Sequence, residues 1–254
     1  MFLAIDIGNT NIVLGAFADQ KILFTERLST DAKKTAFEYA ILLHNVLEIY
    51  HLSEAELEGA IISSVVPVLT TMMKNALHKL SCPKTLIVGP GIKTGLNILL
   101  DNPAQIGADL VVAAVAGIAQ YSCPLILIDM GTATTISVID KNHSFRGGII
   151  MPGLRVSLES LTSSASALPG ISLDPPRHLI GRNTVDSMKS GILYGNASCL
   201  DGMIDRVEKE IGEKTTVVAT GGLSSLVIPL CCHEIIQDED LLMKGLMLLY
   251  QKNR

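Results

Sequence analysis

The sequence predicts an α/β fold in which two similar halves face each other across a cleft. Short apolar strands alternate with helices along all 254 residues, and a strand–turn–strand pattern recurs about half a chain length later. Apolar residues make up 48% of the chain and charged residues only 18%, so the sequence can fill large buried cores. We expect the two halves at residues 1–120 and 121–254.

The first half opens with three short apolar runs separated by polar turns, which is typical of a meander. Thr35 is a preferred N-cap residue, and Pro67 suits the first turn of a helix. The helix after Thr35 has its apolar residues at Phe37, Ile41, Leu42 and Val46. The expected elements are strands 2–7, 12–17 and 22–28, a helix 35–50, a strand 59–64, a helix 67–80, a strand 85–88 and a helix 107–119.

The second half repeats this order. A buried strand again opens it, a hairpin follows, and a proline-rich loop precedes a long helix. A glycine pair, Gly221-Gly222, closes the strand that comes after this helix. The expected elements are strands 125–129, 135–139 and 145–151, a helix 152–161, a loop 165–179, a helix 184–212, a strand 217–220 and a helix 239–252.

An internal repeat organises these elements. The segment Ala4-Ile-Asp-Ile-Gly-Asn-Thr-Asn-Ile12 aligns with Leu127-Ile-Asp-Met-Gly-Thr-Ala-Thr-Thr135, so that Asp6 matches Asp129 and Gly8 matches Gly131. Each copy ends an apolar strand on Asp-x-Gly and turns through small polar residues into another strand. A single turn of this kind is commonly an ordinary hairpin, but the matched pair predicts a shared function.

The two turns are suited to phosphate. Glycine lets the backbone approach a ligand closely, and successive N–H groups in such a turn form a concave set of donors for phosphate oxygens. Asn9, Thr10 and Asn11 add side-chain donors in the first turn, and Thr132, Thr134 and Thr135 add them in the second. A strand-end aspartate does not bind phosphate directly, but it can hold Mg²⁺, its waters or a monovalent cation beside the phosphate. Two such turns would grip a nucleoside triphosphate from both sides.

Asp109 is the candidate general base. It follows Gly107-Ala108 in the first turn of a helix, where an aspartate is often only a favourable partner of the helix dipole. The functional alternative is that Asp109 accepts the proton of an alcohol that attacks the γ-phosphate. Ala219-Thr-Gly-Gly222 ends a strand and is either a tight turn or a place where a nucleoside approaches the backbone.

Charge and cysteine content exclude several classes of protein. The net charge of −5 and the absence of a basic stripe argue against nucleic acid as a partner. The apolar stretch from 110 to 130 is interrupted by polar residues and a proline, so we expect no membrane span. Five cysteines without a C-x-x-C pair predict reduced, mostly buried thiols and a cytoplasmic protein.

With these motifs in order, the chain resembles the type III pantothenate kinases of bacteria, and the resemblance covers nearly all of it. The matching segments are Asp6-Ile-Gly-Asn-Thr-Asn11, Gly91-Ile-Lys-Thr-Gly-Leu96, Asp101-Asn-Pro103 with Gly107-Ala-Asp109, Asp129-Met-Gly-Thr-Ala-Thr-Thr135, Gly147-Gly148 with Pro152-Gly153, Gly181-Arg-Asn-Thr184 with Ser190-Gly191, and Thr220-Gly-Gly222. The resemblance implies two ribonuclease H-like halves, as in the actin-like ATPase duplication, around an interdomain cleft.

The resemblance also implies an activity and a set of site residues. The activity is ATP-dependent phosphorylation of pantothenate, the first step toward coenzyme A, with Mg²⁺ and a monovalent cation (K⁺ or NH₄⁺) in a homodimer. Asp109 would be the base, and Asp129 would bind the monovalent cation. ATP would be held by Asp6, Ile7, Gly8, Asn9, Thr10, Asn11, Ile12, Val13 and Thr132. Pantothenate would be held by positions Leu100, Gly107, Ala108, Asp109, Leu110 and Thr184.

Two positions depart from the family pattern. Leu100 stands where the family has a Tyr before Asp-Asn-Pro, and Leu110 stands where it has an Arg after Gly-x-Asp. Loss of an Arg that pairs with an anion costs about 1.5–3 kcal/mol, or roughly 10- to 150-fold in binding. Two alternatives to the pantothenate kinase therefore stay open: a kinase of the same fold for another small alcohol, and a non-catalytic dimeric regulator of the Bvg accessory factor type.

Overall fold

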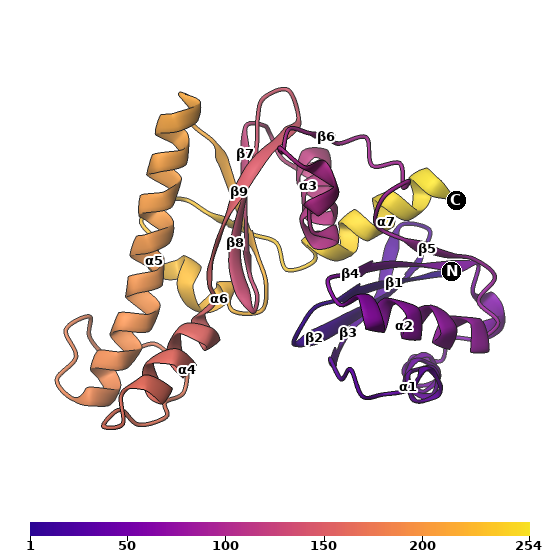
Figure 1. The fold of residues 1–254 in the computed structure, drawn as a ribbon, viewed down its shortest axis with the longest axis horizontal. Helices are drawn as coiled ribbons and strands as arrows, with labels where there is room; N and C mark the ends of the chain where they lie inside the picture. Colours follow the sequence, from indigo (N-terminus) through magenta and orange to yellow (C-terminus); the bar gives the residue numbers. More distant parts are fainter. The chain divides into compact units, whose positions relative to one another are not determined.

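The computed structural model describes residues 1–254 and divides them into two compact units (Figure 1). The first unit comprises residues 1–96, 102–116 and 241–254, and the second comprises 97–101 and 117–240. This division differs from the expected 1–120 and 121–254 in three respects. The boundary falls inside a helix at residue 116, the short segment 97–101 belongs to the second unit, and the C-terminal segment belongs to the first.

A five-stranded sheet in the order β3-β2-β1-β4-β5 forms the centre of the first unit. The predicted meander of three antiparallel strands is confirmed, and β4 and β5 extend it in the direction parallel to β1. Every residue of β1 is buried, because helices cover both faces of the sheet. The strands are β1 (Phe2–Ile7), β2 (Asn11–Ala18), β3 (Lys21–Ser29), β4 (Gly59–Ser64) and β5 (Thr85–Ile87).

Helices α1 (Ala36–Ile49) and α2 (Pro67–Lys79) cover one face of this sheet. Thr35 caps α1 as predicted, in a capping box with Glu38. The apolar periodicity assigned to α1 is only partly correct, because Phe37 and Ile41 are exposed. The buried residues are Tyr39, Ala40, Leu43, Val46 and Leu47. Tyr39 can lie inside because its hydroxyl donates to the Asp31 carbonyl at 2.9 Å.

Helices α3 (Ala108–Gln120) and α7 (Leu241–Asn253) supply the core on the opposite face. The ring of Tyr250 on α7 stacks on Phe2 of β1 with centroids 4.0 Å apart. Asn253 also holds the backbone of Lys93, accepting from its N–H at 2.9 Å and donating to its carbonyl at 3.0 Å. These contacts explain why the C-terminal helix belongs to the first unit.

The sheet of the second unit has the order β11-β10-β7-β8-β9-β6. Read from β11 to β9, this order reproduces the first sheet read from β5 to β3, with β7 in the place of β1 and β10 in the place of β4. The duplication predicted from the Asp-x-Gly repeat is thus confirmed. The strands are β6 (Asn97–Ile98), β7 (Leu125–Met130), β8 (Ala133–Ile139), β9 (Ser144–Pro152), β10 (Thr216–Thr220) and β11 (Ile236–Gln237).

Helices α4 (Leu154–Ser164) and α5 (Thr184–Ile211) pack on one face of the second sheet (Figure 1). The long helix α5 begins at the cap residue Asn183 and ends at Gly212, which has a φ of 75°. The remaining helix is α6 (Ser224–Val227), and short 3₁₀ turns lie at Glu54–Glu56, Pro103–Gln105 and Ile228–Leu230. None of the helices combines the length and the apolar character needed to cross a membrane.

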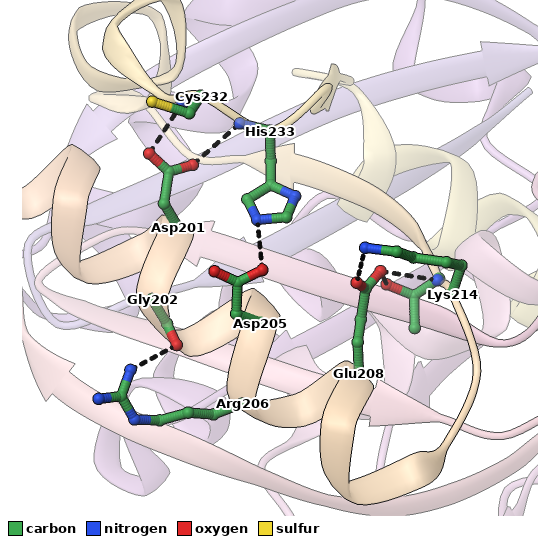
Figure 2. Close-up of polar contacts among 9 residues, drawn as sticks. Asp201, Gly202, Asp205, Arg206, Glu208, Lys214, Cys232 and His233 are labelled. Atoms are coloured by element: carbon green, nitrogen blue, oxygen red, sulfur yellow. Dashed lines mark hydrogen bonds and ion pairs between the residues drawn. The ribbon is translucent and has the colours of Figure 1, made fainter.

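The five cysteines are free, but they are not mostly buried as predicted. Cys82 is buried, whereas Cys199 and Cys232 are exposed. Cys232 lies in a loop that α5 fixes, because the Asp201 carboxylate accepts from the backbone N–H groups of Cys232 at 2.8 Å and of His233 at 3.0 Å (Figure 2). Loop geometry therefore places this cysteine at the surface.

Candidate functional site

The first candidate turn joins β1 to β2. Asp6 is the second-to-last residue of β1 and is only 8% exposed. The Gly8 N–H donates to the Asn11 carbonyl at 2.9 Å, and a Cβ at residue 8 would lie 3.1 Å from that oxygen. Thr30 holds the other side of the turn, since its hydroxyl donates to the Gly8 carbonyl at 2.7 Å and its N–H to the Thr10 carbonyl at 3.0 Å. With these carbonyls occupied, the turn suits an anion better.

The residues predicted to hold ATP fall into two groups in this turn. Asn9, Thr10 and Asn11 are exposed, so their side chains are accessible to a ligand. Ile7 and Ile12 are fully buried in the core under α1 and α2. Any contact that these two residues make with ATP therefore goes through their backbone. Val13 is half-buried, and Gly8 is half-buried at the start of the turn.

The second candidate turn joins β7 to β8 and is one residue shorter than the first. Ile7 pairs with Ile12 around residues 8–11, whereas Met130 pairs with Thr134 around residues 131–133. Ile12 therefore corresponds in space to Thr134, not to Thr135 as the sequence alignment has it. Thr132 is exposed at the tip of this turn, and Asp129 is half-buried beneath it.

Two glycines from elsewhere in the second unit make this shorter turn possible. Gly221 has a φ of 93°, and a Cβ there would lie 2.6 Å from Oδ1 of Asp129. Gly153 donates its N–H to the Thr132 carbonyl at 3.2 Å, and a Cβ there would collide with that oxygen. Gly221 follows β10, whose Thr220 pairs with Asp129, so the predicted strand-end turn contacts the aspartate.

Asp109 lies in the first turn of α3, and its carboxylate is half-buried. Burial raises its pKa, although a hydrogen bond from the Leu110 N–H at 2.9 Å acts in the opposite direction. A Cβ at Gly107 would collide with the Asp109 carboxylate, so glycine is needed for this orientation.

Asp109 and Asp6 lie on the same side of the first sheet. Val111 and Val112, directly after Asp109, pack in the core that contains Phe2 and Ala4. Side chains two residues apart on a strand share a face, so Asp6 faces the same side as Phe2 and Ala4. The fold thus brings the candidate base and the first turn to one face of one unit.

The residues predicted to bind the acceptor are divided between the units. Gly107, Ala108, Asp109 and Leu110 belong to the first unit, at the start of α3. Leu100 belongs to the second unit and is half-buried near Gly147 of β9.

Thr184 is the exposed first residue of α5, beside a cavity of about 210 Å³. The cavity is lined by Arg177, His178, Ile180, Gly181, Arg182, Asn183 and Asp186. The sequence predicted no role for the two arginines of this lining.

No group of three or more His, Cys, Asp or Glu side chains is arranged to hold a metal ion. Mg²⁺ commonly keeps several waters and binds through one or two carboxylates plus substrate phosphates, so single aspartates such as Asp6 and Asp129 suit it.

A larger cavity of about 360 Å³ lies elsewhere in the second unit and does not belong to the site. It is lined by residues that include Glu208, Thr215, Thr216 and His233, at the end of β10 away from Thr220. Two ion pairs lie at this cavity, and in the first Lys214 pairs with Glu208 at 2.6 Å (Figure 2). His233 contacts Asp205 at 3.1 Å.

Comparisons with known proteins agree in one family. A family model described as type III pantothenate kinase matches residues 2–206. A relative with that name from Bacillus cytotoxicus is 44% identical, covering 100% of this chain and 97% of its own length. Another from Geotalea uraniireducens is 42% identical, covering 100% and 99%.

Solved structures with less than 25% identity show the fold alone. A Campylobacter jejuni protein described as a Baf family transcriptional activator has a TM-score of 0.58 at 21% identity, covering 98% of this chain and 97% of its own. A ROK family glucokinase from Streptomyces griseus, solved with glucose and AMPPNP, has a TM-score of 0.52 at 14% identity, covering 98% and 99%. The chain therefore has the two-sheet fold of actin-like ATPases and sugar kinases.

Proposed function

The chain belongs to the type III pantothenate kinase family, and from this premise we propose that it transfers the γ-phosphoryl group of ATP to the pantothenate hydroxyl with Asp109 as general base. The product would be 4'-phosphopantothenate, which leads toward coenzyme A. The observation that carries the proposal is Asp109 itself. It is a half-buried carboxylate with a raised pKa, on the same face of the first sheet as Asp6.

Phosphoryl transfer requires little covalent chemistry from the protein, which mainly positions the reactants. The turns after β1 and β7 would orient the phosphates through backbone N–H groups and through Asn9, Thr10, Asn11 and Thr132. Asp109 would accept the hydroxyl proton as the alcohol oxygen attacks the γ-phosphorus, and ADP would leave. A raised pKa makes Asp109 a stronger base than an exposed aspartate.

The cations would be held by the two strand-end aspartates. Asp6 would receive the waters of Mg²⁺, and Asp129 would bind K⁺ or NH₄⁺. When bound, these ions neutralise the charge of the phosphates. Gly221 supports the role of Asp129, because any side chain at residue 221 would collide with the Asp129 carboxylate.

The acceptor side departs from the family pattern at Leu100 and Leu110. Arg177 and Arg182 line the cavity beside Thr184 and would offer the pantothenate carboxylate the positive charge that Leu110 cannot supply. Thr184 would contact pantothenate through its hydroxyl.

A homodimer in the cytoplasm completes the proposal. Large apolar side chains are exposed on the second unit, among them Ile150 at 76%, Ile180 at 81% and Leu179 at 60%, which suits a surface that another copy covers. The five free cysteines suit a reducing compartment. If the protein is a homodimer, light scattering of the purified protein will give twice the mass of one chain.

The test is ADP release from ATP, Mg²⁺ and K⁺ with pantothenate and with a panel of other small hydroxy acids. The proposal predicts turnover with pantothenate and little with the others. Turnover with another alcohol alone would show that Leu100 and Leu110 have changed the substrate. A folded dimer without turnover on any acceptor would support the regulator instead.

A further inference from the structure

Ser63 on β4 has a buried hydroxyl without a hydrogen-bond partner. The residue is 0% exposed, and its Oγ is one of two buried side-chain oxygens that lack a partner; the other belongs to Thr134. Buried polar groups are almost always paired in proteins. An orphaned hydroxyl at a candidate site therefore points to a partner that arrives with a ligand.

Ser63 lies directly beside Asp6. The strands β1 and β4 are parallel, and their register pairs Ala4 with Ile61 and Asp6 with Ser63. Ala4 and Ile61 both pack in the core that α3 and α7 cover. Because side chains alternate along a strand, Asp6 and Ser63 share that same face. The hydroxyl and the carboxylate are thus neighbours on the face covered by the helix that carries Asp109.

The second unit repeats this pairing. There β7 and β10 are parallel, and their register pairs Asp129 with Thr220. Thr220 is 2% exposed. Each half of the duplication therefore sets a buried hydroxyl beside its strand-end aspartate, although one residue is a serine and the other a threonine. A recurrence at the carboxyl ends of matching strands indicates a role in the site.

We propose that Ser63 is a positioning residue for the Asp6 carboxylate when the magnesium nucleotide binds. Its hydroxyl donates to one carboxylate oxygen, directly or through one water, and leaves the other oxygen for the waters of Mg²⁺. This inference rests on the proposed function only as far as nucleotide binding, because it does not involve the acceptor.

The test compares Ser63→Ala with Thr134→Val as a matched control. Both changes remove a buried orphan hydroxyl with little change in volume. The sequence suggested Thr134 as a phosphate donor, but that expectation is wrong for its side chain, which is 1% exposed. Thr134 shares its face of β8 with Ile136 and Val138, which pack in the core under α4 and α5, away from the Asp129 face. Thermal unfolding without ligand checks that both variants fold.

The readout is the dissociation constant of ADP measured by calorimetry with Mg²⁺ and again in EDTA. Ser63→Ala is expected to weaken binding about 5- to 20-fold in Mg²⁺ and to leave binding in EDTA unchanged. Thr134→Val is expected to change neither constant, and Ser63→Thr, which keeps the hydroxyl, to restore the magnesium dependence.

Two results would overturn the inference. One is wild-type affinity of Ser63→Ala in Mg²⁺, which would leave the hydroxyl with only an ordered water as partner. The other is an equal loss in Mg²⁺ and in EDTA, which would indicate a structural defect. Neither result bears on whether pantothenate is the acceptor. The outcome of this test is therefore independent of the outcome of the test of the proposed function.

Discussion

At the scale of single residues, the protonation state of Asp109 controls the proposed reaction. Burial favours the neutral acid and raises the pKa of Asp109, so the base form is lost as pH falls through that raised value. We expect the acid limb of the kcat/KM profile, which reports groups of the free enzyme, to lie above the ordinary aspartate value of about 3.9. Steady-state kinetics between pH 4 and 8 would measure it. An activity that stays flat down to pH 4 in folded protein would contradict the assignment.

Leu110 tests how the acceptor is bound. The family pattern has an Arg at this position, in the first turn of α3 next to Asp109. Leu110→Arg should add a charge-assisted hydrogen bond to an anionic acceptor and lower the KM for pantothenate by about 10-fold or more, with kcat nearly unchanged. An unchanged KM would show that another cation, such as Arg182, already pairs with the carboxylate, and Arg182→Gln should then raise the KM.

At the scale of elements, Gly221 couples the end of β10 to Asp129. Its φ of 93° and its close approach to Asp129 and Met130 leave no room for a side chain. Gly221→Ala should destabilise the protein by about 2 kcal/mol or more and raise the K⁺ concentration needed for half-maximal activity. Thermal unfolding and a K⁺ titration would measure both effects.

The matched control lies on α5. Gly191 is exposed there, and a Cβ would meet nothing within 4 Å. Gly191→Ala should stabilise the protein by about 0.5–1 kcal/mol through helix propensity, without affecting K⁺. Equal effects of the two substitutions would contradict the proposed coupling.

The end of α5 is fixed to the start of β10 by Glu208 (Figure 2). Burial raises the pKa of Glu208, but bonds from Lys214 at 2.6 Å and from the Thr215 N–H at 2.9 Å outweigh burial and lower it. The stabilisation is therefore present above the unfolded value of about 4.3 and is lost as pH falls through the lower folded value.

Glu208→Gln should accordingly cost about 1–3 kcal/mol of unfolding free energy at pH 7, and the deficit should shrink below about pH 4. Urea denaturation at both pH values measures this difference. Glu210→Gln, at an exposed position on the same helix, should be neutral at both. A deficit of the same size at pH 7 and at low pH would show that the charge of Glu208 is not its cause.

The elements also show where sequence patterns are sufficient. Strands and helices with strong alternation, caps or a starting Pro67 were predictable within a few residues. The buried face of α1 could not be predicted, because apolar residues with helical spacing lie on two overlapping faces of this helix. Only tertiary contacts decide that Tyr39 is buried and Phe37 is exposed. The short strands β6 and β11 carry two residues each, too few for any pattern.

At the scale of the whole molecule, the duplication could be predicted from the two Asp-x-Gly turns, and the sheet topology bears it out. The roles of Ser63 and Gly221 could not, because they depend on which strands pair and in which register. The same holds for α7, whose return to the first unit follows from long-range packing of Tyr250 on Phe2. The polar residues of the turns can be recognised in the local sequence, whereas the residues around the turns depend on which distant strands pair.

The central claim joins Asp109 to the chemical step, and single-turnover phosphorylation of pantothenate tests it most directly. With saturating ATP, Mg²⁺ and K⁺, Asp109→Asn should slow phosphoryl transfer by about 10²- to 10⁴-fold while the ATP dissociation constant stays nearly unchanged. Asp101→Asn, at an exposed aspartate nearby in sequence, should keep the wild-type rate. An Asp109→Asn variant that phosphorylates pantothenate at the wild-type rate would contradict the account.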